Sequence, residues 1–128
     1  MILAIDVQYS GASAFVAGVV FSHWQSEEPQ AEFTSTLQGV AEYEPGHFYK
    51  RELPCIMRLI EEHDLKPETI VVDGYVFLDA QQRPGLGKYL FDELDGRIEV
   101  IGVATRSFSG IREDHDVLRG KSVKPLYV

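Results

Sequence analysis

Hydrophobic residues in the first third of the chain follow patterns that are typical of β-strands. An apolar run over residues 2–7 is interrupted only by Asp6 near its end, which predicts a buried strand whose tip reaches solvent. Residues 13–24 are rich in β-branched and aromatic side chains and predict a second strand. Apolar and polar residues alternate over 30–37 and predict a third. Because the connections are short, we expect an antiparallel meander.

The pattern changes to helical spacing in the middle of the chain. Apolar residues recur every three or four positions from Tyr49 to Ile60, which predicts an amphipathic surface helix. An apolar run over 69–73 then predicts a buried strand that ends in Asp73. The later predicted elements are a helix over 87–94, a strand over 98–104 and a final strand over 123–128. Strand–helix–strand units pair in parallel, so the order predicts one α/β domain, residues 1–128, with a mixed sheet flanked by helices.

Three acidic residues occupy positions where carboxylates can gather. Asp6 and Asp73 close two apolar strands, and ligands collect beyond the carboxyl ends of such strands. Glu52 lies beside the apolar stripe of the predicted helix. Crowded carboxylates repel unless a cation bridges them, and hard divalent ions take oxygen ligands, so a metal site is one interpretation. The alternative is that Asp73 begins a turn with Gly74 and that Glu52 is a solvated acid favoured by the helix dipole.

Charge limits the kinds of partner. The 128 residues include 12 Lys and Arg against 20 Asp and Glu, a net charge of −8. Proteins that hold a nucleic-acid backbone usually carry a basic patch. This balance therefore argues against a nucleic-acid partner unless some carboxylates bind metal, because a bound cation reverses the local sign that a phosphate meets.

The remaining composition points to a protein of a reducing compartment. Cys55 is the one cysteine, so no intramolecular disulfide is available. The chain has no basic leader before Asp6 and no apolar run near the ~20 residues of a membrane helix. We expect a cytoplasmic protein without a membrane partner.

Several short motifs occur in a fixed order along nearly the whole chain. They are Ala4-Ile5-Asp6-Val7, Tyr43-Glu44-Pro45-Gly46, Arg51-Glu52, Val72-Asp73-Gly74, Ile101-Gly102-Val103-Ala104 and the segment Val123 to Val128. In this order they resemble the endonuclease V family. The resemblance implies a ribonuclease H-like fold in which Asp6, Glu52 and Asp73 bind Mg²⁺ or Mn²⁺. It also implies hydrolysis of a phosphodiester near a deaminated base, notably inosine, in DNA or RNA, an activity of DNA repair.

The resemblance further assigns residues to the substrate. Tyr43, Pro45 and Gly46 correspond to a wedge that opens the strand, and an aromatic ring on a rigid Pro-Gly turn can stack on a base. Tyr43 can equally cover the start of the helix. Gly74 begins the loop that we expect to read the base.

This chain also departs from the family pattern. Asp79 stands at the position of a histidine and Thr105 at that of a lysine, with Arg106 beside it as a substitute charge, and the family continues past Val128 into a further helix. Three hypotheses result. The first is a metal-dependent endonuclease, and the second is a relative that binds nucleic acid or a protein partner without cleavage. The third is an enzyme in which the same fold acts on another phosphate ester or a nucleotide.

Overall fold

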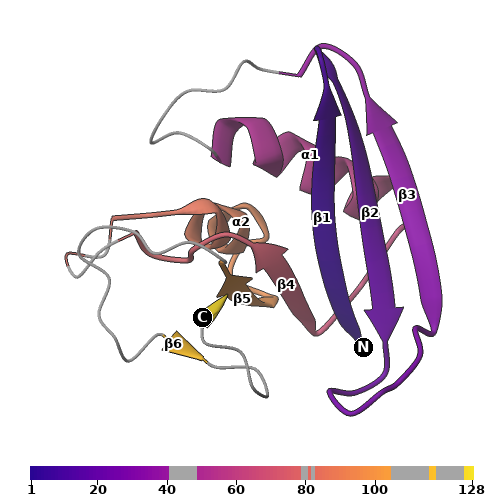
Figure 1. Ribbon diagram of the computed structural model, residues 1–128, viewed down its shortest axis with the longest axis vertical. Helices are drawn as coiled ribbons and strands as arrows, with labels where there is room; N and C mark the ends of the chain where they lie inside the picture. Colours follow the sequence, from indigo (N-terminus) through magenta and orange to yellow (C-terminus); the bar gives the residue numbers. More distant parts are fainter. Residues whose placement is uncertain (41–48, 79–80, 82, 105–115, 118–125) are drawn as a thin grey trace.

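A single mixed sheet with helices packed against it forms the body of the protein (Figure 1). The structure is a computed structural model that describes residues 1–40, 49–78, 81, 83–104, 116–117 and 126–128. Within these ranges no helix is both long and apolar enough to cross a membrane.

The described elements follow the predicted order β-β-β-α-β-α-β, with two short strands after it. They are β1 (Ile2–Ser10), β2 (Ser13–Phe21), β3 (Ala31–Leu37), α1 (Tyr49–Glu62), β4 (Thr69–Asp73), α2 (Leu86–Glu93), β5 (Glu99–Val103), β6 (Asp116–Val117) and β7 (Leu126–Tyr127). The strand order in the main sheet is β3-β2-β1-β4-β5, while β6 and β7 pair with each other.

Strand direction divides the sheet into two halves. The meander β1–β2–β3 is antiparallel, as predicted, and turns at Gly11, whose φ of 61° suits a residue without a side chain. Strand β4 pairs in parallel with β1 on one side and with β5 on the other. The carboxyl ends of β1, β4 and β5 therefore point the same way.

The core lies between the sheet and the two helices. Leu3 and Val16 from the sheet, Leu59 from α1 and Leu90 from α2 belong to one buried cluster. Helix α1 crosses behind β1 and β2 in Figure 1 and touches β2 closely at Gly18. A β-carbon at Gly18 would lie 2.6 Å from Cδ2 of Leu59, so the missing side chain is what lets α1 sit there.

The C-terminal end of α1 is fastened to β3 by polar contacts. The Ser35 hydroxyl donates a hydrogen bond to the Glu62 carboxylate, and Nε2 of His63 lies 2.7 Å from the carbonyl oxygen of Thr34. The His63 ring also packs on Phe33, with ring centroids 5.1 Å apart. These contacts fix the direction in which α1 runs, and thereby the place of its first turn.

The first strand is longer than predicted. Strand β1 continues to Ser10, so Asp6 lies within the strand and the prediction that it marks the tip was wrong. Gln8 and Ser10 are polar yet stay in the strand because the antiparallel partner β2 supplies their backbone hydrogen bonds. On the other side, pairing with β4 ends at Ile5 and Val72, so Asp6 still stands where the parallel contact stops.

The other boundaries differ by a few residues. Strand β2 ends at Phe21 instead of residue 24, because the chain turns after it, with the amide of Ser26 donating to the carbonyl of His23. At the end of the chain the described strand is only Leu126–Tyr127, and residues 123–125 of the predicted final strand lie outside the described residues. The short strand β6 was not predicted.

Candidate functional site

Asp6 and Asp73 come together on neighbouring parallel strands. Each follows one member of the last paired couple, Ile5 and Val72, whose side chains are buried, so both aspartates are exposed. The backbone amide of Val7 donates to Oδ1 of Asp6 at 3.0 Å. Partial burial and then the negative charge of Asp6 raise the pKa of Asp73. The charge of Asp6 therefore reaches Asp73, which places the two carboxylates near each other, as the sequence predicts for two strand ends at one edge.

Glu52 approaches the same edge from the first turn of α1. Its side chain is only 7% exposed, so the alternative of a solvated first-turn acid was wrong. The pKa of Glu52 is raised to about 7, mainly by burial and further by the charges of Asp6 and Asp73. Tyr9 and Arg51 act in the opposite direction and lower it. The structure thus places a buried glutamate within electrostatic reach of both aspartates.

Tyr9 and Arg51 surround Glu52 and were not singled out from the sequence. The Arg51 guanidinium carbon lies 3.6 Å from the centre of the Tyr9 ring, a close cation–π contact. The Tyr9 hydroxyl interacts with Glu52 and lowers its pKa, and among the described residues Nε of Arg51 is buried without a hydrogen-bond partner of normal geometry. Alternation along β1 could have found Tyr9, because it lies on the same side as Leu3 and Ile5, which face α1.

The donor atoms of the three acids decide which kind of metal ion this edge of the sheet suits. Asp6, Glu52 and Asp73 offer only carboxylate oxygens, the donors that Mg²⁺ and Mn²⁺ prefer, and a cation would relieve their mutual repulsion. Among the described residues, no three His, Cys, Asp or Glu side chains are arranged so that they could hold an ion as they stand. The donor chemistry therefore fits a hard divalent cation, and the three side chains would have to close around it.

Gly74 follows Asp73 directly and joins the site to β5. Its φ of 151° is accessible mainly to glycine, and its amide donates to the carbonyl of Val103 at 2.8 Å. A β-carbon on Gly102 would lie 2.3 Å from the Gly74 oxygen, so these two glycines allow a close crossing of the backbone. A role of Gly74 in substrate binding stays a prediction.

The other residues assigned to the substrate are not part of the described structure. Tyr43, Pro45, Gly46, Asp79, Thr105 and Arg106 all lie outside the described residues. Their assignments therefore stay predictions.

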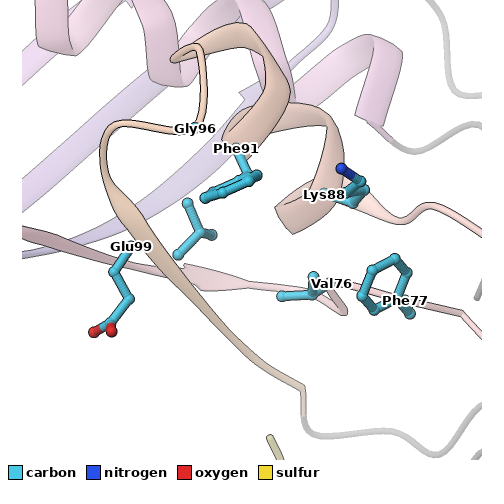
Figure 2. Close-up of a pocket in the computed structure, with 7 residues that line it drawn as sticks. Val76, Phe77, Lys88, Phe91, Gly96 and Glu99 are labelled. Carbon is cyan, nitrogen blue, oxygen red and sulfur yellow. The ribbon is translucent and has the colours of Figure 1, made fainter.

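A cavity of about 500 Å³ lies beside α2 and is separate from the acidic residues (Figure 2). Its lining is formed by Val76, Phe77, Lys88, Phe91, Gly96, Glu99 and Val100. Figure 2 shows Lys88 and Glu99 on opposite sides of it, with Phe91 between them. Lys88 is already paired with Asp92, at 2.7 Å, and Glu99 accepts a hydrogen bond from Thr69. None of the three acids lines this cavity, so we do not assign the chemistry to it.

The strand order, with Asp6 and Asp73 at the point where the pairing of β1 with β4 ends, defines an α/β protein with the ribonuclease H-like fold. The family follows from the sequence: the model of the family described as Endonuclease V matches residues 1–128, and the chain belongs to this family. A comparison with curated proteins gave no match.

Solved structures of endonuclease V share this fold. The enzyme from Streptomyces avermitilis is 26% identical, with a TM-score of 0.76 over 98% of this chain and 63% of that one. The catalytic domain of human endonuclease V is 20% identical, with a TM-score of 0.76 over 98% and 65%. Endonuclease V from Ciona intestinalis, in complex with a 24mer DNA containing an inosine followed by a ribo-adenosine, is 17% identical, with a TM-score of 0.78 over 98% and 69%. The chain thus spans roughly two thirds of the length of these structures.

Proposed function

We propose that this protein is a metal-dependent endonuclease that hydrolyses a phosphodiester near a deaminated base, inosine in particular, in DNA or RNA. Membership of the endonuclease V family supports a phosphodiester hydrolase. The relative from Ciona intestinalis, which was solved with inosine-containing DNA, supports the choice of substrate. We further propose a cytoplasmic role in repair of deaminated nucleic acid.

One observation carries the proposal. Glu52 is buried at the start of α1, and its pKa is raised to about 7 in part by the charges of Asp6 and Asp73. A protein does not gain stability by placing two aspartate charges within electrostatic reach of a buried glutamate, so this arrangement needs another reason. A divalent cation supplies that reason, because it removes the repulsion and presents positive charge to a phosphate.

The proposal assigns metal binding to the three acids and substrate contacts to the residues around them. Asp6, Glu52 and Asp73 would hold Mg²⁺ or Mn²⁺, which when bound lowers the pKa of an attacking water and neutralises charge on the leaving oxygen. Asp6 and Asp73 are exposed, so they face the side from which a phosphate can approach. Glu52 is buried and would bind the ion from the side of the protein interior. Tyr43, Pro45 and Gly46 would separate the strand next to the base, and Gly74, Asp79, Thr105 and Arg106 would contact the substrate around it.

A nicking assay tests the proposal. The protein is incubated with single- and double-stranded DNA and RNA that contain one inosine, with Mg²⁺ or Mn²⁺ or with EDTA. We expect nicking that requires the metal and the inosine and that Asp73→Asn abolishes. Asp95→Asn is the matched control, because Asp95 lies in a turn with a φ of 57°, a conformation that asparagine tolerates. Metal-independent nicking, or nicking that Asp73→Asn leaves intact, would contradict the proposal.

A second candidate is a relative that binds nucleic acid or a protein partner without cleaving. It is favoured by the net charge of −8 and by the fact that the described acids do not form a ready-made ion site. The same oligonucleotides separate the two candidates. Retention of inosine-containing strands in a filter-binding assay, without any nicking in Mg²⁺ or Mn²⁺, would favour the second.

A further inference from the structure

The side chains of β2 that point away from α1 break the pattern of a solvated sheet face. In an antiparallel strand with one face in water, apolar and polar residues alternate. The outward positions of β2 are instead all apolar: Phe15, Ala17, Val19 and Phe21. Within the part of the chain that the structure describes, none of these four belongs to the core between the sheet and the helices. The sheet therefore carries a second set of apolar side chains, on the side away from α1.

The strand register extends this second set across the sheet. Val19 lies opposite Glu32 of β3 on one side and opposite Ala4 of β1 on the other. Ala4 is paired with Val71 of β4, and Val71 with Ile101 of β5. We call this side of the sheet, together with the outward side chains of β2, the outer face. Parallel strands that are apolar on both sides are covered on both sides in proteins, so the outer face suits a covering element.

The outer face is exposed in the described structure. Figure 1 looks onto β1, β2 and β3 with α1 behind them, and no described helix lies in front of these strands. The Phe15 side chain is 47% exposed. Trp24, which follows β2, is 57% exposed and packs edge-on against Phe21, with ring centroids 6.0 Å apart. Neighbouring apolar side chains that stay in water mark surfaces at which other macromolecules bind.

The charge around the outer face decides which macromolecule it suits. Residues 1–49 contain no lysine or arginine, whereas the described part of the meander and its turns carries Asp6, Glu27, Glu28 and Glu32. Because its charge is negative, the outer face repels a nucleic-acid backbone and an anionic membrane. It also repels a second copy of this chain, since a two-fold dimer would bring the same acids together. A basic protein partner is the remaining match.

We propose that the outer face binds an amphipathic helix of another protein, with an apolar stripe flanked by lysine or arginine. Helices are what cover the faces of mixed and parallel sheets in α/β proteins. From Phe15 to Phe21 the strand is roughly 20 Å long, which matches about 13 residues of helix. The stripe would lie along β2, with basic side chains beside Glu32. The inference does not rest on the proposed function, because neither the outward side chains of β2 nor Glu32 are assigned to metal or substrate.

Three model peptides test the apolar stripe and the charge. The probe is an amphipathic helical peptide of leucine and lysine, about 18 residues or five turns long. One control has glutamate in place of lysine, and the other has the same composition as the probe in scrambled order. Trp24 is the one tryptophan of the chain and lies against Phe21, so its fluorescence reports docking directly. We expect the probe to shift Trp24 emission to shorter wavelength, less so at high salt, and neither control to do so.

Substitutions on the outer face locate the binding. Phe15→Ser removes the exposed ring, and we expect the affinity for the probe to fall about 10-fold or more. Phe77→Ser is the matched control, because Phe77 is also an exposed phenylalanine but lies beside α2 (Figure 2). It should bind the probe as the wild type does. Glu32→Lys reverses the charge beside Val19, so it should bind the probe about 5-fold more weakly and should gain affinity for the glutamate peptide.

The gain in Glu32→Lys is a result that a misfolded variant would not give, and melting temperatures of all three variants check that they fold. Equal binding of the probe and the scrambled peptide would overturn the inference, because charge alone would then explain the contact. So would undiminished binding in Phe15→Ser. A dimer of the protein alone in analytical ultracentrifugation that Phe15→Ser dissociates would also overturn it, since a second copy would then cover the outer face.

Discussion

The two ends of α1 each present a glutamate to the sheet, and the two glutamates are in opposite situations. Glu52, in the first turn, is buried within electrostatic reach of two other carboxylates, and its pKa is raised to about 7. Glu62, in the last turn, is exposed and accepts a hydrogen bond from Ser35, with Nε of Arg58 at 3.8 Å. The Ser35 bond, helped by Arg58 and His63, lowers the pKa of Glu62.

This difference separates Glu62, a carboxylate that stabilises the fold, from Glu52, a carboxylate that the fold places for a function. Ionised Glu62 has its partners within the protein and needs none from outside. Ionised Glu52 has a nearby guanidinium but also two like charges within electrostatic reach. Only a proton or a bound cation relieves this repulsion. Strongly raised pKa values of this kind mark candidate functional sites, and the contrast within one helix makes the assignment sharper.

The largest expected effect of the contrast is on catalysis. Glu52→Gln keeps the size of the side chain but removes its charge, and we expect metal-dependent nicking to fall by about 1,000-fold or more, the scale of losing a principal electrostatic group. Glu62→Gln should nick at the wild-type rate. Initial rates on an inosine-containing strand with Mn²⁺ measure both. Equal losses in the two variants would break the comparison.

The next effect is on stability in the absence of metal. Because the pKa of Glu52 is about 7 in the folded protein and near 4.5 when unfolded, the folded state binds the proton more tightly. Its contribution to stability is full below about pH 4.5 and is lost as the pH rises to about 7. In urea unfolding with EDTA, the free energy of unfolding of Glu52→Gln should therefore rise relative to that of the wild type by up to about 3 kcal/mol between pH 4 and pH 8.

Glu62→Gln provides the opposite sign in the same experiment. A lowered pKa means that the ionised form is favoured in the folded state, so its contribution is present at neutral pH and is lost as the pH falls. A wild-type difference for Glu52→Gln that does not change with pH would contradict the charge cluster at the first turn.

A smaller effect on stability is expected at the close contact between Gly18 of β2 and the middle of α1. In Gly18→Ala the new methyl group would lie 2.6 Å from Leu59 Cδ2 and 2.9 Å from Leu3 Cδ1, both in the core. We expect a loss of about 1–2 kcal/mol in the free energy of unfolding, measured in urea. Leu59→Ala makes room for the methyl group, so the two substitutions together should cost less than their sum. Additive losses would show that the close contact between Gly18 and Leu59 does not determine how α1 packs on β2.

The smallest effect is expected at the C-terminal end of α1. Ser35→Ala removes the hydrogen bond to Glu62, but the exposed carboxylate can exchange that partner for water. We expect a slightly lower melting temperature and unchanged Mn²⁺ binding, measured by calorimetry and by electron paramagnetic resonance. A change in Mn²⁺ binding would mean that the two ends of the helix are coupled.

The sequence predicted the features that depend on periodicity. Alternation and apolar runs predicted the order of the elements along the chain, and the two aspartates were expected to meet if their strands were neighbours, because parallel strands end at one edge. Glu52 could be predicted to lie toward the core from its place beside the stripe that begins at Tyr49. These predictions follow from local spacing, which the fold preserves.

The features that depend on how two elements cross could not be predicted in the same way. The stacking of Arg51 on Tyr9 requires the rotation of α1 over β1, which no spacing within either element fixes. The length of β1 also escaped prediction, because Gln8 and Ser10 are polar and their strand conformation comes from pairing with β2. The raised pKa of Glu52 arises from three elements together and so has no signature in any one of them.

The parallel pairing of β1 with β4 has a consequence for the order of folding. The β1–β2 hairpin and the β2–β3 pair join residues that are close in sequence, whereas Ile5 and Val72 meet only after β2, β3 and α1 have intervened. Contacts between distant residues form slowly, because the chain between them must first be ordered. The meander can therefore fold before Asp73 reaches Asp6, so the repulsion between the two carboxylates arises only when β4 joins a strand that already has its antiparallel partner.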